Sequence, residues 1–226
     1  DVTPATVDRG TKPDEARSRR AAHALEWATA ARHGAFWLED QPFSIDAALS
    51  ASSHAIHAQS DKLARDLADR ALSANPRHPG LLNNRGFAKA RLGDLAGASK
   101  DLMQARRQPA DSGSRACAAA TEGFILFRAG LTDAGRLRYQ LSVDSFIHRR
   151  QPGRAAQAAI NLALEETRLG LPEAAEAWSR ATALVARDSE PLSGHLLAAA
   201  RLLAHPAGRG RADEPHRLTE SVRDLS

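Results

Sequence analysis

The sequence predicts an all-α protein built as a stack of antiparallel helix hairpins, and two observations predict it. The first is composition: alanine is abundant, and aromatic residues make up only 4% of the 226 residues. Alanine is the strongest helix former, and its small side chain lets neighbouring helices approach closely. The second is a turn, Arg91-Leu92-Gly93, that recurs as Arg128-Ala129-Gly130 and Arg168-Leu169-Gly170. Its glycines are 37 and 40 residues apart, a period that fits one helix, one turn and a second helix.

The N-terminal part is expected to contain one helix before the repeats begin. Pro4, Gly10 and Pro13 among polar residues predict a flexible lead-in over residues 1–13. Small and apolar residues at helical spacing then predict a single helix over 14–38, and the break after it completes an N-terminal helix and linker over 14–44.

The repeat domain is expected to cover residues 45–205, and its helices are bounded by recognisable signals. Ser44 can cap the first of them, Asn75-Pro76 ends the second, and Gly93, Gly130 and Gly170 supply helix ends that favour a left-handed residue. The helices expected are 45–58, 61–74, 79–91, 94–107, 114–128, 132–149, 153–168, 172–187 and 191–204. The charged, Gly- and Pro-containing segment 206–226 predicts a tail that is flexible or that orders on a partner.

Small residues inside these units resemble those of the tetratricopeptide repeat family. Residues 79–112 form the clearest unit, with Gly86, Ala98 and Ala105 at family positions, and Ala64 precedes Ala98 by the family period of 34 residues. About four degenerate units cover 45–187. The resemblance implies a right-handed solenoid of antiparallel hairpins with extra helices at both ends. It also implies that two sets of small residues set the helix packing, Gly86, Gly123 and Ala163 on first helices and Ala98, Ala134 and Ala174 on second helices.

The same resemblance implies that the first helices of the hairpins line a concave groove that binds a protein or peptide. The positions expected to face it are Asn83, Asn84, Phe87, Arg91, Thr121, Phe124, Arg128, Asn161, Leu164 and Arg168. An asparagine amide can bond both the N–H and the C=O of an extended peptide, and the apolar side chains would form pockets. Each position also has an interpretation without a ligand: the arginines as a solvated rim, the asparagines as bonds between helices, and the phenylalanines as core.

Charge and motif patterns disfavour several other classes of protein. The net charge is +4 with a pI near 9.8, but basic and acidic residues alternate, which disfavours nucleic-acid binding. The single Cys117 excludes an internal disulfide, and no apolar run approaches the length of a membrane span, so we expect a cytoplasmic protein. The densest basic stretch, 148–154, could meet an acidic partner or a phosphate backbone, although a solvated loop is its default interpretation.

No pattern in the sequence predicts catalysis, a cofactor or a metal. His54 and His57 are three residues apart on a helix, but nothing nearby completes a metal site. Glu165 and Glu166 are adjacent, so their side chains should point apart and form no acid–base pair. No phosphate-binding loop or nucleophile motif is present.

Three hypotheses about function follow. The first is a non-catalytic scaffold that binds a protein segment through a groove or through the ends of the stack. The second is a sensor or adaptor region of a longer protein whose catalytic part lies elsewhere. The third and weakest is a nucleic-acid-binding repeat. A homodimer through the end that carries Trp27 and Trp37 is also left open.

Overall fold

The chain folds into α-helices joined by short turns. The computed structural model describes residues 13–188, 194, 196–198, 200 and 201, and this part of the chain contains helices and no strand. The helices are α2 (Pro13–His23), α3 (Trp27–Asp40), α4 (Ile45–His57), α5 (Asp61–Ala74), α6 (Pro79–Arg91), α7 (Leu95–Arg106), α8 (Ser112–Arg128), α9 (Thr132–His148), α10 (Pro152–Leu169) and α11 (Ala174–Val185). The expected lead-in before Pro13, most of the expected helix 191–204, and the expected tail lie outside the described residues.

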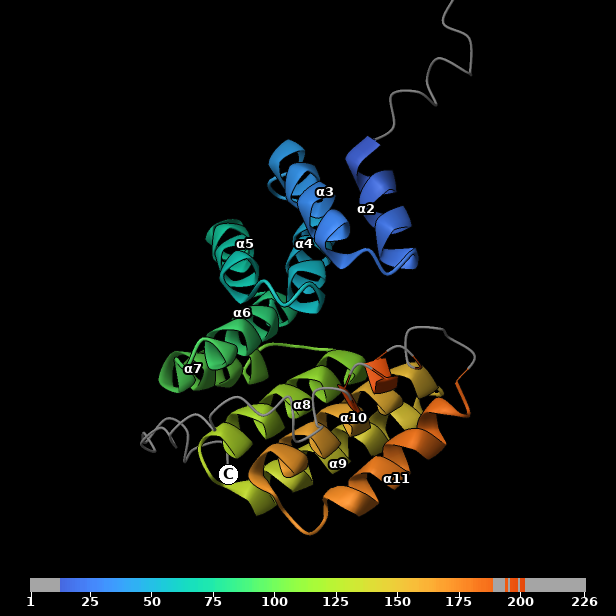
Figure 1. The fold of residues 1–226 in the computed structure, drawn as a ribbon. Helices are drawn as coiled ribbons and strands as arrows, with labels where there is room; N and C mark the ends of the chain where they lie inside the picture. The colour runs from blue at the N-terminus through green and yellow to red at the C-terminus, as the bar shows by residue number, and fades with distance from the viewer. Residues whose placement is uncertain (1–12, 189–193, 195, 199, 202–226) are drawn as a thin grey trace, which may run out of the picture.

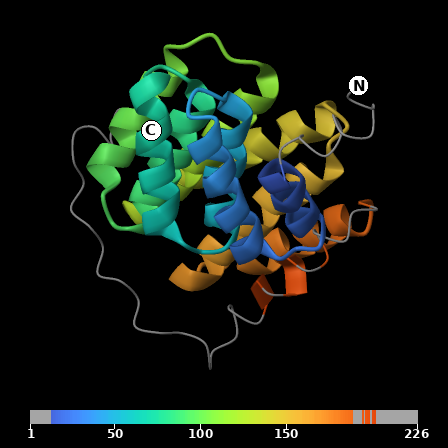
Figure 2. The ribbon, with the colours of Figure 1, turned by 90° about the horizontal axis from the view of Figure 1, so that it is seen from above.

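Each helix packs against the next one in the chain, so the described chain is a succession of helix pairs (Figure 1). In addition, α4 packs against α6, α6 against α8, and α8 against α10, which places every second helix in one continuous layer. We call α4, α6, α8 and α10 the first-helix layer. Figure 2 shows the same helices from above, where the N-terminal helices overlie the later ones.

The helix ends follow the expected local signals closely. The Ser44 hydroxyl accepts a hydrogen bond from the backbone N–H of Ala47, and thereby caps α4. Gly93, Gly130 and Gly170 have φ values of 91°, 82° and 68°, a region that glycine adopts without the steric cost that a side chain brings. Each of these glycines lies in the turn between two helices that pack against each other.

The N-terminal region differs from the expected single helix over 14–38. The chain reverses after α2, where Leu25 adopts φ 60°, and α3 then packs back against α2. The Ser18 hydroxyl donates to the carbonyl oxygen of Ala30 across this reversal, at 2.9 Å. Helical periodicity could not reveal the break, because no glycine or proline marks it and the apolar spacing continues on both sides.

Small residues allow the paired helices to approach closely. A methyl group added at Gly86 would lie 2.4 Å from a Leu102 side-chain carbon and 3.3 Å from the Ala98 carbonyl oxygen, so this glycine is enclosed by α7. In the next hairpin the approach is between two glycines, since a methyl group at either Gly123 or Gly135 would lie 3.0 Å from the other's carbonyl oxygen. The comparison of the repeats within this sequence predicted Ala134 at this contact. The structure places Gly135 there, five residues after the turn glycine Gly130, as Ala98 is after Gly93.

Candidate functional site

The ten candidate groove residues lie on three helices of the first-helix layer. Four of them belong to α6, three to α8 and three to α10. Because α6 packs against α8 and α8 against α10, the candidates are carried on neighbouring helices. Their individual surroundings, however, differ from one residue to the next.

The three asparagines divide into one that is engaged and two that are not. The Asn84 amide donates to the Ser52 hydroxyl on α4 at 2.9 Å, so it bonds two helices of the layer together. The Asn83 Oδ1 atom is buried and has no hydrogen-bond partner among the described residues. Asn161 is half-buried, and no polar contact to it is recorded within the described part of the chain. Asn83 and Asn161 thus retain hydrogen-bonding capacity, whereas Asn84 serves the fold.

The apolar candidates are mainly part of the core. Phe124 is 6% exposed, and its ring lies 5.2 Å from that of the half-buried Phe87, which joins α8 to α6. Leu164 is also half-buried and packs against the core formed by the last helices. Thr121 is buried, and its hydroxyl donates to the carbonyl oxygen of Cys117 within α8. Phe87 and Leu164 are the apolar candidates that keep part of their surface exposed.

The three recurring arginines are held by carboxylates of the chain itself. Arg91 lies 2.9 Å from a carboxylate oxygen of Asp61, at the start of α5. Arg128 and Arg168 share the carboxylate of Glu165, at 3.4 and 3.1 Å. The guanidinium of Arg128 also lies over the Phe124 ring, 4.9 Å from the ring centre. Arg91 and Arg128 thus join neighbouring helices, whereas the contact of Arg168 lies within α10.

The adjacent glutamates of α10 point to different partners. The Glu166 carboxylate, 1% exposed, accepts from Arg136 of α9 at 2.6 Å. Glu165 faces the arginines of α8 and α10 instead. The two carboxylates therefore join α10 to different neighbouring helices.

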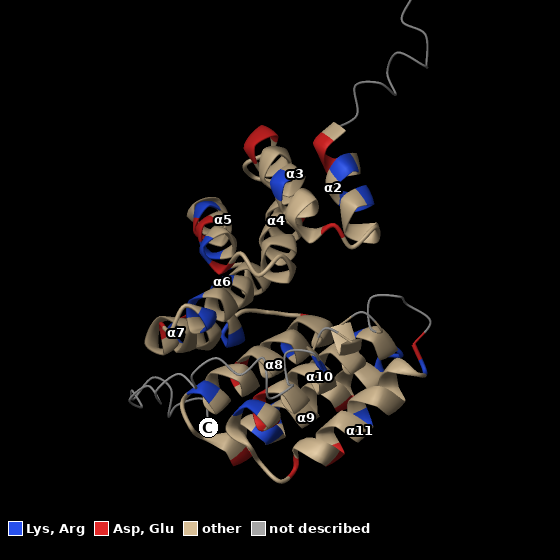
Figure 3. Ribbon diagram, in the orientation of Figure 1, with Lys and Arg blue, Asp and Glu red and all other residues tan. Residues whose placement is uncertain are grey.

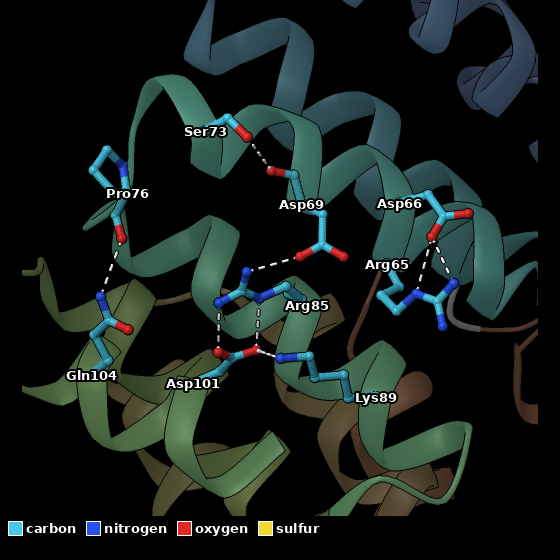
Figure 4. A network of polar contacts seen from close by, with 9 residues as sticks. All are labelled: Arg65, Asp66, Asp69, Ser73, Pro76, Arg85, Lys89, Asp101 and Gln104. Carbon is cyan, nitrogen blue, oxygen red and sulfur yellow. Dashed lines mark hydrogen bonds and ion pairs between the residues drawn. The ribbon is translucent and has the colours of Figure 1, made fainter. Parts of the chain in front are cut away.

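A charged cluster on α5, α6 and α7 was not identified from the sequence (Figure 4). Asp101 is 3% exposed, and its two carboxylate oxygens accept from Arg85 at 2.6 and 2.8 Å. Lys89 lies 2.9 Å from the same carboxylate, and Arg85 also donates to Asp69 at 2.8 Å. The cluster links the α6–α7 hairpin to α5, the helix that precedes it.

The α8–α9 hairpin has an ion pair at the corresponding positions, but with the acidic residue on its first helix and the basic residue on its second. Arg138 follows Glu122 by 16 residues, as Asp101 follows Arg85. Glu122 is 3% exposed and lies between Arg138 of α9 and Arg106 of α7, at 3.4 and 3.5 Å. Burial raises the pKa of Glu122, and the two arginines oppose that shift.

The corresponding positions in the outer hairpins carry no charge. They are Ala51 and Leu67 in the α4–α5 hairpin, and Leu162 and Trp178 in the α10–α11 hairpin. The repeat alignment could have revealed this charge exchange, because one position changes from Arg to Glu while its partner changes from Asp to Arg. Buried ion pairs are thus confined to the two middle hairpins at these positions.

An open depression of about 400 Å³ adjoins the Asp101 cluster. Its lining includes Asp69, Ser73, Arg85 and Gln104. Arg85 is bonded to Asp69, the Ser73 hydroxyl donates to a backbone carbonyl, and Gln104 donates to the carbonyl of Pro76. Since these polar groups bond to the chain itself, the depression is not a compelling ligand site.

His54 and His57 lie in the contact between α4 and the N-terminal helices. The Trp27 ring stacks on His57 with 4.5 Å between ring centres, and the Ser18 hydroxyl lies 3.2 Å from a ring nitrogen of His54. Burial lowers the pKa of His57 to about 4, and the neighbouring His54 contributes to the shift. Within the described residues, no group of three His, Cys, Asp or Glu side chains is arranged to hold a metal ion.

No protein-family model matches this chain, and no curated protein sequence matches it either. Among the described residues, no helix has both the length and the apolar character that a membrane span requires. The arrangement of the helices and the contacts of individual residues are therefore the basis for a functional proposal.

Proposed function

We propose that this chain is a non-catalytic scaffold that binds an extended segment of another protein on the first-helix layer. In this proposal the hairpins form a right-handed solenoid like that of the tetratricopeptide repeat family. The observation that carries it is the continuous packing of α4, α6, α8 and α10, with a second helix returning after each of them. Such stacks offer one long face to a partner.

The proposed contacts come from the residues that keep unused surface or bonding capacity. Asn161 of α10 would bond the backbone of the bound segment, because an amide can both donate and accept, and Asn83 of α6 would contact the segment with the part of its side chain that is not buried. Phe87 and Leu164 would contact its apolar side chains with their exposed parts. Asn84, Thr121 and Phe124 would support this surface from within the fold.

The test begins with a displayed peptide library selected on the wild-type protein. A selected peptide is then synthesised with a fluorescent label, and its affinity is measured by anisotropy. The double variant Asn83→Ala, Asn161→Ala should weaken binding about tenfold, since each lost hydrogen bond is worth roughly 0.5–1.5 kcal/mol.

The matched control replaces two polar residues of second helices, Lys100→Ala of α7 and Gln140→Ala of α9. It should bind the peptide as the wild type does. Equal losses in the two double variants, or unchanged binding in both, would refute binding through the first-helix layer.

A further inference from the structure

Four helix ends meet at one edge of the last two hairpins, where α8 and α10 begin and α9 and α11 end (Figure 1). Arg149, just after α9, donates to the Ser112 hydroxyl at the start of α8. Gly153, in the first turn of α10, lies against Asp188, because a methyl group added there would be 2.8 Å from a carboxylate oxygen of that aspartate. These contacts bring the helix ends together.

Exposed arginines gather at this edge, which we call the basic edge. They are Arg115, Arg149, Arg150, Arg154 and Arg187, with the exposed His148 beside them. No salt bridge to a described residue is recorded for any of these five arginines. Elsewhere basic and acidic residues are interspersed along the helices (Figure 3), and arginines such as Arg136 and Arg180 lie against carboxylates.

Among the described residues, the acidic side chains at this edge are Asp111 and Asp188, and both are engaged by the fold. The Asp111 carboxylate accepts hydrogen bonds from the backbone of Gly113 and Ser114 and from the Ser114 hydroxyl. These bonds hold the pKa of Asp111 near 2, with a smaller contribution from Arg149. Asp188 lies against the first turn of α10, where a carboxylate is favoured by the exposed N–H groups of a helix start. The Asp111 carboxylate is thus bonded mainly to the start of α8.

The chemistry of the edge fits carboxylates better than nucleic acid. Among the described side chains of these helix ends the aromatic one is Phe146, which is 3% exposed and covered by Arg154 at 5.9 Å. It offers no face on which a base could stack, as single-stranded nucleic acid requires. The edge consists of helix ends and the turns between them, and among the described helices α8 to α11 none projects from it to enter a duplex groove. Ile147 is 47% exposed there and can pack against an apolar side chain.

We propose that the basic edge binds a carboxylate-rich segment of a partner protein through Arg115, Arg149, Arg150, Arg154 and Arg187. A guanidinium forms paired hydrogen bonds with a carboxylate, and a partner with several acids relieves the repulsion among neighbouring arginines. The basic edge includes the first turns of α8 and α10, but it shares no residue with the contacts proposed for the first-helix layer, so either proposal can fail without the other.

The test measures binding of a short fluorescent polyglutamate peptide by anisotropy at low and at physiological salt. The variant Arg149→Ala, Arg154→Ala should bind about tenfold more weakly at low salt. The control Arg65→Ala, Arg70→Ala removes two arginines of α5 that lie against Asp66 and Glu39, and it should bind as the wild type does.

A third variant separates binding from folding. Arg150 has φ 56°, so Arg150→Gly removes a charge and also the backbone strain of that residue. It should bind several-fold more weakly while its unfolding midpoint stays equal or rises. The proposal is overturned if polyglutamate does not bind, if the α5 control loses as much affinity as the edge variant, or if single-stranded RNA or a DNA duplex of matched charge binds more tightly than polyglutamate.

Discussion

Replacing Asp101 by asparagine is expected to destabilise the protein far more than any exposed charge removal. The Asp101 side chain is 4% exposed and faces Arg85 and Lys89, each of which is 20% exposed. Asparagine keeps the shape but removes the charge, which leaves two cations facing each other in the cluster of Figure 4.

Breaking a buried ion pair from one side costs about 3–5 kcal/mol. Arg85 keeps its contact with Asp69, and both cations reach water in part, so the lower end of that range applies. We expect Asp101→Asn to lower the free energy of unfolding by about 3 kcal/mol, measured by urea denaturation followed by circular dichroism.

The matched control is Asp66→Asn, because Asp66 is 60% exposed and its contact is with the adjacent Arg65. That loss should be under about 1 kcal/mol. An Asp101→Asn variant that unfolds within about 1 kcal/mol of the wild type, or that matches the control, would refute the buried cluster as a stabilising contact.

The double exchange Arg85→Glu, Asp101→Arg gives the second hairpin the polarity of Glu122 and Arg138. The free energy of unfolding of this double variant should lie between that of Asp101→Asn and that of the wild type. The new glutamate would face Asp69, and the new arginine would face Lys89. Recovery of the full wild-type stability would show that Asp69 and Lys89 do not determine which position of the pair carries the acidic residue.

Four further changes test the packing and the role of His57. Gly86→Leu should destabilise strongly, and Gly135→Ala by about 1–3 kcal/mol, since the added methyl at Gly135 would meet the Phe127 ring at 2.6 Å. Arg91→Ala should cost under about 1 kcal/mol, and equal thermal shifts for the glycine and arginine variants would argue against the close packing. The pKa of His57 is lowered to about 4, so the unfolded chain binds more protons than the fold between about pH 6.5 and 4. Stability should therefore be full above about pH 6.5 and fall as the pH drops through that window, by about 1–3 kcal/mol once stacking of the charged ring on Trp27 offsets part of the burial. His57→Phe should flatten this dependence in urea titrations at several pH values, and an unchanged pH profile would exclude His57 as its source.

Local signals predicted most of the helices because they act within a few residues. Ser44 caps its helix through a bond to the N–H three residues on, and the turn glycines take the left-handed conformation that only glycine adopts freely. The break at Leu25 could not be predicted in this way, because a leucine carries no signal for φ 60°. That conformation is stabilised by tertiary contacts of α3 with α2 and α4.

The repeat frame placed the small residues well but shifted one of them. The repeat pattern identified Gly86 and Gly123 correctly. At the second helix we matched Ala98 with the alanine Ala134, although the residue at the same distance from the turn glycine is Gly135. The contact at Gly135 depends on the partner helix, which a single sequence does not display. Its distance from Gly130 was nevertheless available.

The candidate site was predictable in position and not in detail. The sequence located the candidate residues on neighbouring helices, but it could not show that Asn84 bonds to Ser52 or that Glu165 holds Arg128. Alternating charges predicted solvated faces, and Asp101 is buried all the same. A buried charge depends on partners 12 and 16 residues away, across a hairpin, where periodicity carries no information.

The most direct test of the proposed scaffold maps the bound segment onto the protein. A peptide selected on the wild type is added to isotope-labelled protein, and backbone amide shifts are followed by NMR. Binding to the first-helix layer predicts the largest shifts in α6, α8 and α10, around Asn83 and Asn161. Shifts confined to α5, α7 and α9, or to the turn at residues 148–154, would contradict it.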